Sequence, residues 1–321
     1  MTSEETLSAE SNTAHSKVNH EASNLVTVAM QSIEQILFDA VDSDIEVLRK
    51  ASRHILQAGG KRIRPRLLML SFAAVGGTDI SLALPPAAAI ELVHTASVVH
   101  DDINDHGVVR RGRPSVNAVW GRTFALLTGD FLFTKVYELM APYKDLNELF
   151  AGAAIALVEG ETLQAAAIKD NSLSSEIYYK IIALKTAELF RVGAMLGAKL
   201  ASASSDEIKA LEQYGYNIGL AFQIIDDVLD IIGDEGQLGK TAGLDAKQGK
   251  GFASIHDNGG NADDPMEAIK RKIMDGDTIN EAQRQAQNLV EQAIDALNTL
   301  KDTPYKEGLI DLANAIVNRQ S

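Results

Sequence analysis

From Leu25 onward, apolar residues recur every three or four positions through almost the whole chain. This spacing is typical of amphipathic α-helices, whereas the alternating pattern of a half-buried strand is missing. No composition break marks a second domain, so we expect one all-α domain of ten or more helices over residues 25–321, packed as a layered bundle. Besides a helix that starts near Leu25, the pattern predicts Pro85–Ile103, Thr123–Ala141, Leu146–Ala167, Ser172–Leu200, Ser205–Ile232, Met266–Met274, Ile279–Leu300 and Tyr305–Val317.

Segments rich in glycine and polar residues interrupt this helical pattern. We expect loops at Gly107–Ser115, Gly233–Gly251 and His256–Pro265. Residues 1–24 are polar, and no basic start leads into an apolar run, so we expect a disordered N-terminal tail rather than a signal peptide.

Charge and composition exclude several classes of function. The net charge is −14, which disfavours non-specific binding to nucleic acid or to anionic lipid. The chain has no cysteine, so disulfide scaffolds, thiolate zinc sites and cysteine nucleophiles are excluded. No apolar run approaches the length of a membrane span, and we therefore expect a soluble cytoplasmic protein that has no transmembrane segment and binds no nucleic acid.

Two acidic motifs of the form DDxxD stand out because they lie in otherwise apolar helices. The first comprises Asp101, Asp102 and Asp105, and the second comprises Asp226, Asp227 and Asp230. The first and last residues of each motif are one helical turn apart and share a face. Carboxylates this close, flanked by apolar residues, are unfavourable unless a cation lies between them. Ligands that are all oxygens favour magnesium or manganese over zinc, and magnesium usually takes its remaining oxygens from water and substrate phosphates.

Two basic runs are conspicuous in so acidic a chain. Residues 59–66 read GGKRIRPR, and residues 110–113 read RRGR, directly after the first acidic motif. Arginine binds phosphate oxygens through its two-pronged guanidinium group, and lysine supplies a point charge. A basic surface patch is the simpler interpretation of one run alone. Basic residues beside paired carboxylates instead indicate a site that takes magnesium and a polyphosphate together.

These motifs, in this order, resemble the polyprenyl synthetase family of trans-isoprenyl diphosphate synthases, from about Leu25 to Arg319. The matching segments are GGKRIRP at 59–65, HTASVVHDDINDHGVVRRGRPSVN at 94–117, Gly129-Asp130, KTA at 185–187, FQIIDDVLD at 222–230 and LGK at 238–240. The resemblance implies an isoprenoid synthase bundle around a central cavity, acting as a homodimer. It also implies condensation of isopentenyl diphosphate with an allylic diphosphate, head to tail.

The resemblance assigns roles to individual residues. All six motif aspartates, namely Asp101, Asp102, Asp105, Asp226, Asp227 and Asp230, are implied magnesium ligands on the allylic diphosphate. That diphosphate is contacted by Arg110, Lys185, Thr186, Gln223 and Lys240, and isopentenyl diphosphate by Lys61, Arg64, His94 and Arg111. The implied catalytic set is Asp101, Asp102, Asp105, Lys185, Asp226, Asp227 and Lys240. The chain departs from the family pattern after Lys250, so the resemblance supports a diphosphate contact by Lys240 more strongly than one by Lys250.

Product length is expected to follow the depth of the cavity. In the family, an aromatic residue shortly before the first acidic motif stops elongation early, whereas this chain has the small residues Ala96 and Ser97 there. We therefore expect a polyprenyl product longer than farnesyl, with geranylgeranyl diphosphate synthase as the alternative, and an Ala96→Phe variant that makes a shorter product. Candidate floor residues on the next helix are Phe131, Phe133, Tyr137 and Met140.

Two further classes of function compete with the transferase. A terpene cyclase shares the helical fold and one DDxxD motif, but it lacks the second full motif and the GGKRIRP site. A non-catalytic regulatory subunit usually loses one acidic motif, and this chain keeps both. The sequence therefore favours the chain-elongating transferase.

Overall fold

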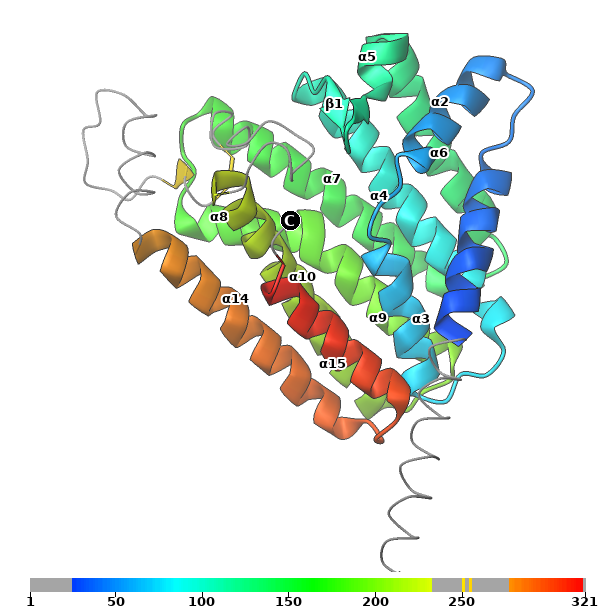
Figure 1. Cartoon of the computed structure of the whole chain (residues 1–321), viewed down its shortest axis with the longest axis vertical. Coiled ribbons are helices and arrows are strands. Elements are labelled where there is room, and N and C mark those ends of the chain that lie inside the picture. The colour runs from blue at the N-terminus through cyan, green and yellow to red at the C-terminus, as the bar shows by residue number, and fades with distance from the viewer. Residues whose placement is uncertain (1–24, 233–249, 252–253, 256–276, 320–321) are drawn as a thin grey trace, which may run out of the picture.

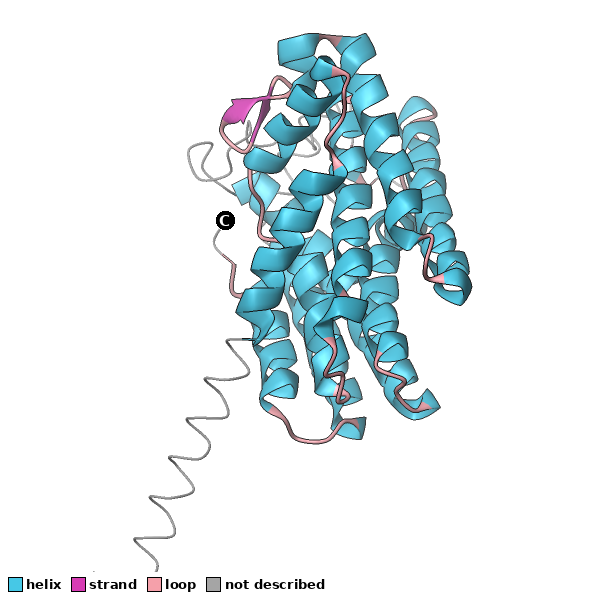
Figure 2. Cartoon of the chain, turned by 90° about the vertical axis from the view of Figure 1, so that its right-hand side faces the viewer, coloured by secondary structure: helices cyan, strands magenta, loops and turns pink. Residues whose placement is uncertain are grey.

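The computed structural model describes residues 25–232, 250–251, 254–255 and 277–319. These residues form a bundle of long helices that lie side by side (Figures 1 and 2). After a helix over residues 25–40 come α2 (Glu46–Gln57), α3 (Ile63–Ala74), α4 (Leu84–Asn104), α5 (Val116–Trp120), α6 (Arg122–Met140), α7 (Asn147–Lys169), α8 (Ser175–Ile182), α9 (Glu188–Leu200), α10 (Ser205–Ile232), α14 (Asp277–Ala296) and α15 (Pro304–Val317).

The predicted all-α fold is confirmed, and two local expectations need correction. The helix expected over Ser172–Leu200 is divided by a π-helical turn, η3 (Ala183–Ala187), which contains Lys185 and Thr186. The loop expected at Gly107–Ser115 contains a small antiparallel hairpin of β1 (Val109–Arg110) and β2 (Arg113–Pro114). Such two-residue strands are too short to show an alternating pattern. The predicted helix Met266–Met274, the loop His256–Pro265, the tail 1–24 and most of the loop Gly233–Gly251 lie outside the described residues.

Apolar residues of the bundle form two packed clusters on either side of α9. One joins α9 and α10 to α14 and α15, and the other joins α4 and α6 to α2 and the first helix. Helix α3 contributes to both, and its residues from Leu67 to Ala74 are all buried. Helices buried on most faces leave few positions open to water, so polar side chains among them mark the functional region.

Two helical segments have the length and mean hydropathy of a membrane span, Ile80–Asn104 and Lys144–Lys169. The first is 67% buried inside the bundle and contains α4, which carries the first acidic motif. The second contains α7 and is 28% buried. A core helix of a soluble protein passes the same test, so these two segments do not establish a membrane protein.

Candidate active site

A cavity of about 220 Å³ lies among α3, α4, α7, η3 and α10. Its wall includes carboxylates and cations from distant parts of the chain. The predicted site residues at this wall are Arg64, His94, Ser97, Asp101, Asp105, Arg110, Lys185, Thr186, Gln223, Asp226 and Asp227. The apolar remainder includes Leu157, Ile168, Leu173, Ile181 and Ile182.

Four aspartates of the two acidic motifs face the cavity. Asp101 and Asp105 reach it from the C-terminal end of α4, and Asp226 and Asp227 reach it from α10. The Lys250 ammonium group is ion-paired with Asp105, and the Arg319 guanidinium group lies 3.5 Å from Asp226. The two motifs, far apart in sequence, therefore lie on one cavity, with a cation beside each.

The other two motif aspartates do not line the cavity. Asp102 is 1% exposed, and one of its carboxylate oxygens accepts hydrogen bonds from Nε and Nη2 of Arg110 at 3.0 and 2.7 Å. Burial raises the pKa of Asp102, and the positive charge of Arg110 opposes that rise. Asp230 is also 1% exposed. Around α4, Asp102 points about 100° away from Asp101 and contacts Arg110 instead of the cavity. Asp102 therefore holds Arg110 at the cavity.

A chain of hydrogen bonds organises the second motif. The Tyr178 hydroxyl donates to Asp227 at 2.8 Å, and Nε2 of Gln223 donates to the other oxygen of Asp227 at the same distance. The Thr186 hydroxyl in turn donates to Oε1 of Gln223 at 2.7 Å. The predicted sharing of one helix face by Gln223 and Asp227 is thus observed. Burial, followed by the charge of Asp227, raises the pKa of Tyr178 well above its usual value.

Lys185 lies in the π-helical turn, where its ammonium group is 2.7 Å from Oε1 of Glu161 on α7. Burial lowers the pKa of Lys185, but Asp101 and Glu161 outweigh burial and raise that pKa above its usual value. Burial and Asp101 raise the pKa of Glu161 to about 7, against the opposing effect of Lys185. Lys185 therefore stays charged at the cavity, and turns of this kind are common at functional sites.

The basic run 59–66 is divided by the fold. Arg64 is buried at the cavity, with its guanidinium carbon 4.8 Å from the centre of the Phe190 ring, and burial lowers its pKa to about 10. His94 lies at the same wall, and its pKa is far below 6.5 because of burial and nearby arginines. Lys61 and Arg111 do not line the cavity. Arg111 lies close to the same loop, since a Cβ on Gly60 would come within 2.7 Å of its Nη1 atom.

The predicted chain-length residues differ in their position relative to the cavity. Ser97 lines the cavity, but Ala96 is fully buried in the core and does not. Phe133 packs its ring against His100, with centroids 5.9 Å apart, and Tyr137 is 75% exposed. None of the four candidate floor residues on α6 lines the cavity. Helix α6 instead packs against α4 within the second apolar cluster.

Some cavity residues were missed by the sequence reasoning. Glu161, Gln164 and Tyr178 line the wall, and Arg319 approaches it from the C-terminal end. The segment Glu159-Gly160-Glu161, acidic within an apolar helix, was an available signal for Glu161. Lys250 lines the cavity too. Lys240 lies outside the described residues.

The donor set at this cavity fits a hard divalent cation. The acidic groups there supply oxygen atoms alone, and cationic side chains already lie beside Asp105 and Asp226. Within the described ranges, no group of three or more His, Cys, Asp or Glu residues is arranged to hold a metal by itself. A cation here would need further oxygens from a ligand, which is the habit of magnesium with phosphates.

Comparisons with known proteins agree with this geometry. A family model described as polyprenyl synthetase matches residues 45–292. Octaprenyl diphosphate synthase of Escherichia coli is 33% identical over 309 residues, covering 90% of this chain and 95% of that one. A polyprenyl synthase of Caulobacter crescentus, solved with calcium and isoprenyl diphosphate, superposes with a TM-score of 0.85 at 32% identity, covering 93% and 97% of the two chains. Decaprenyl diphosphate synthase of Rhodobacter capsulatus superposes with a TM-score of 0.83 at 30% identity, covering 94% and 99%.

Proposed function

This chain belongs to the polyprenyl synthetase family and is a trans-prenyltransferase that makes a polyprenyl diphosphate longer than farnesyl; from this premise, we propose how its residues share the reaction. The substrates are isopentenyl diphosphate and an allylic diphosphate. The observation that carries the proposal is the single cavity onto which Asp101 and Asp105 face from α4 and Asp226 and Asp227 from α10.

The carboxylates and cations of the cavity wall bind the allylic diphosphate. Asp101, Asp105 and Asp226, with Asp227 beside them, would hold magnesium, which supplies positive charge to the leaving diphosphate when it is bound. Lys185 and Arg110 are oriented by Glu161 and Asp102, and they place fixed positive charge where the leaving group becomes negative. Gln223 and Thr186 hold their positions through the hydrogen-bond chain to Asp227. Lys250 and Lys240 belong to the same proposed cationic set.

Isopentenyl diphosphate binds beside the first substrate, against Arg64 and His94, with Lys61 and Arg111 nearby. Breaking the allylic carbon–oxygen bond releases diphosphate and leaves an allylic carbocation, which the double bond of isopentenyl diphosphate attacks to form the new carbon–carbon bond. The resulting cation loses a proton to an oxygen of the released diphosphate. The apolar wall of Leu157, Ile168, Leu173, Ile181 and Ile182 excludes water, which would otherwise capture the carbocation. Ser97 at this wall leaves room for a growing chain.

A turnover experiment tests these assignments. Purified protein is incubated with isopentenyl diphosphate and each allylic starter, and the extracted alcohols are sized, with and without added magnesium. We expect products longer than farnesyl that disappear on chelation, and an Asp226→Asn variant that loses most of this activity. Asp44→Asn, which makes the same change at an exposed position away from the cavity, serves as the matched control. Full activity of Asp226→Asn would contradict the proposed metal set.

The proposal extends to the organisation of the enzyme. Residues 25–321 act as one catalytic domain, because the cavity draws its wall from α3 through α10. A homodimer is supported by large apolar side chains exposed on α6 and α7, namely Phe124, Leu126, Leu127, Tyr137, Ile155 and Val158. A cytoplasmic location is part of the same proposal. Light scattering of the purified chain and fractionation of cells test these two points.

A further inference from the structure

The loop before α3 has an unusual backbone. Gly59 and Gly60 have positive φ angles of 74° and 154°, and Arg62, the residue that precedes α3, has φ 48° and ψ 38°. A left-handed conformation is unfavourable for a residue with a side chain, and it persists where the surroundings hold it in place. This loop carries Lys61, and Arg64 follows in the first turn of α3. Whatever holds Arg62 therefore also sets the position of both neighbouring cations.

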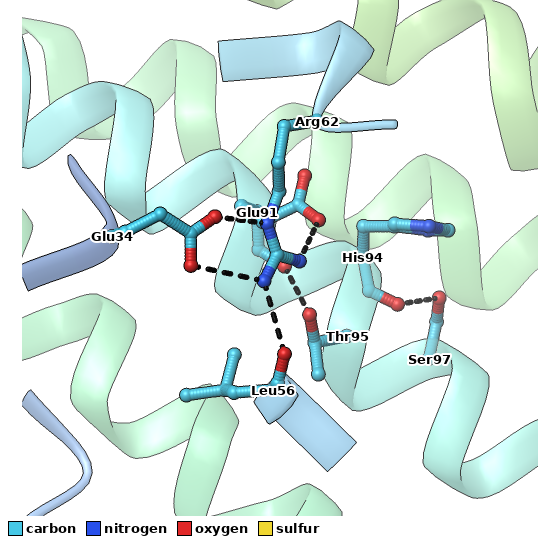
Figure 3. A network of polar contacts seen from close by, with 7 residues as sticks. All are labelled: Glu34, Leu56, Arg62, Glu91, His94, Thr95 and Ser97. Carbon is cyan, nitrogen blue, oxygen red and sulfur yellow. Dashed lines mark hydrogen bonds and ion pairs between the residues drawn. The ribbon is translucent and has the colours of Figure 1, made fainter. Parts of the chain in front are cut away.

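The Arg62 side chain is held by three other helices (Figure 3). Its guanidinium group donates to both carboxylate oxygens of Glu34 in the first helix, to the Leu56 carbonyl at the end of α2, and to Glu91 of α4 at 2.7 Å. The Arg62 and Glu91 side chains are 8% and 3% exposed. We call Glu34, Arg62, Glu91 and the Leu56 carbonyl the Arg62 network. It fixes the loop relative to three helices at once.

The Arg62 network is connected to the proposed isopentenyl diphosphate contacts through charge and through α4. Burial alone would lower the pKa of Arg62, yet hydrogen bonds and the charges of Glu34 and Glu91 raise it above its usual value. The charge of Glu91 also favours the charged forms of Arg64 and Arg111. His94 follows Glu91 by nearly one turn on α4, and the Thr95 hydroxyl donates to the Glu91 carbonyl at 2.7 Å. Glu91 thus acts as a counter-charge behind several cations.

Arg62 itself does not line the cavity, although its neighbour Arg64 does. It lines a separate hollow together with Glu34 and Arg66. The cations of the run 61–66 therefore have different environments, because Arg64 lines the cavity whereas Arg62 is bound to Glu34 and Glu91. Arg62 therefore does not contact a diphosphate bound in the cavity.

We propose that Arg62 and Glu91 are positioning residues that hold Lys61, Arg64 and His94 in place for isopentenyl diphosphate, without touching the substrate. This inference depends on the proposed function of the cavity. The network acts on one substrate because the proposed allylic diphosphate contacts Lys185 and Arg110 are held by other partners, Glu161 and Asp102. Its loss is expected to weaken binding of isopentenyl diphosphate selectively.

A pair of variants separates positioning from mere stability. Arg62→Met leaves the buried Glu91 charge without its partner, so this variant is expected to be destabilised. The double variant Arg62→Met/Glu91→Gln removes both charges, and its resistance to urea is expected to return toward that of the wild type. In both variants we expect the KM for isopentenyl diphosphate to rise roughly tenfold, the effect of one displaced charged contact, while the KM for the allylic substrate stays within about twofold.

Arg191→Met is the matched control. Arg191 is also bound to two glutamates, Glu188 and Glu212, on α9 and α10, and it does not line the cavity. This variant is expected to lose stability and keep both KM values. Calorimetric titration of each variant with isopentenyl diphosphate provides the same comparison without turnover, should Arg62→Met fold too poorly for kinetics.

Two results would overturn the inference. One is recovery of the KM for isopentenyl diphosphate in the double variant along with its stability, and the other is an equal rise of both KM values. A wild-type enzyme with no turnover would instead contradict the proposed function, so the two failures are distinguishable.

Discussion

The contact between α7 and the π-helical turn depends on the absence of a side chain at Gly160. A Cβ at this position would lie 2.8 Å from Cγ of Lys185, 2.9 Å from the Lys185 backbone nitrogen and 2.9 Å from Cβ of Leu184. Two of these three atoms belong to the backbone or lie next to it, so no simple rotation relieves the clash. Gly160→Ala is therefore expected to push η3 away from α7 and to displace Lys185.

The size of the effect follows from two opposing terms. Alanine is favoured over glycine in a helix by about 1 kcal/mol, whereas overpacking a filled site costs about 1–3 kcal/mol. The net change in the free energy of unfolding is a loss of up to about 2 kcal/mol. Gly152 is the matched control on the same helix, because a Cβ there has no neighbour within 4 Å. Gly152→Ala is expected to gain up to about 1 kcal/mol from helix propensity alone.

Urea unfolding and steady-state kinetics measure both consequences. Since misplacing a catalytic group by about 1 Å can cost roughly 100-fold in rate, we expect kcat/KM of Gly160→Ala to fall by about tenfold or more. Gly152→Ala is expected to keep the wild-type value. The reasoning is refuted if Gly160→Ala is stabilised as much as Gly152→Ala and retains full kcat/KM.

Three further predictions follow from the cavity wall. Ser97→Phe is expected to shorten the product because Ser97 lines the cavity. Ala96→Phe is expected mainly to lower stability, by about 1–3 kcal/mol, because Ala96 is fully buried. Ser97→Phe products of unchanged length on chromatography would contradict the first expectation. The folded state holds His94 neutral, so below pH 6.5 the unfolded state binds more protons, and the free energy of unfolding falls by about 1.4 kcal/mol for each pH unit of acidification. His94→Asn is expected to lack this contribution to the pH dependence. Equal changes in urea stability between pH 7.5 and 5.5 for both proteins would exclude the contribution of His94. Tyr178→Phe removes a buried hydrogen bond to Asp227 and is expected to cost about 1–3 kcal/mol in urea unfolding, so wild-type stability would argue against that contact.

Local pattern was enough to predict much of this protein. Helical periodicity indicated the all-α fold, because burial of one helix face depends on residues three and four apart. The same argument placed Asp101 with Asp105, and Gln223 with Asp227, on shared faces. Family resemblance in the ordered motifs then supplied the expected reaction. None of these steps needed a long-range contact to be known.

The tertiary structure decided how similar residues divide their roles. The run 61–66 reads as four equivalent cations, yet Arg62 is turned into the protein and Arg64 is turned toward the cavity. Likewise, Asp102 holds Arg110 while Asp101 faces the cavity, and Ser97 lines the wall while the adjacent Ala96 is buried in the core. Which side of a helix meets a cavity depends on the neighbours that pack around it, and those neighbours come from distant parts of the chain. Periodicity along one helix carries no information about them.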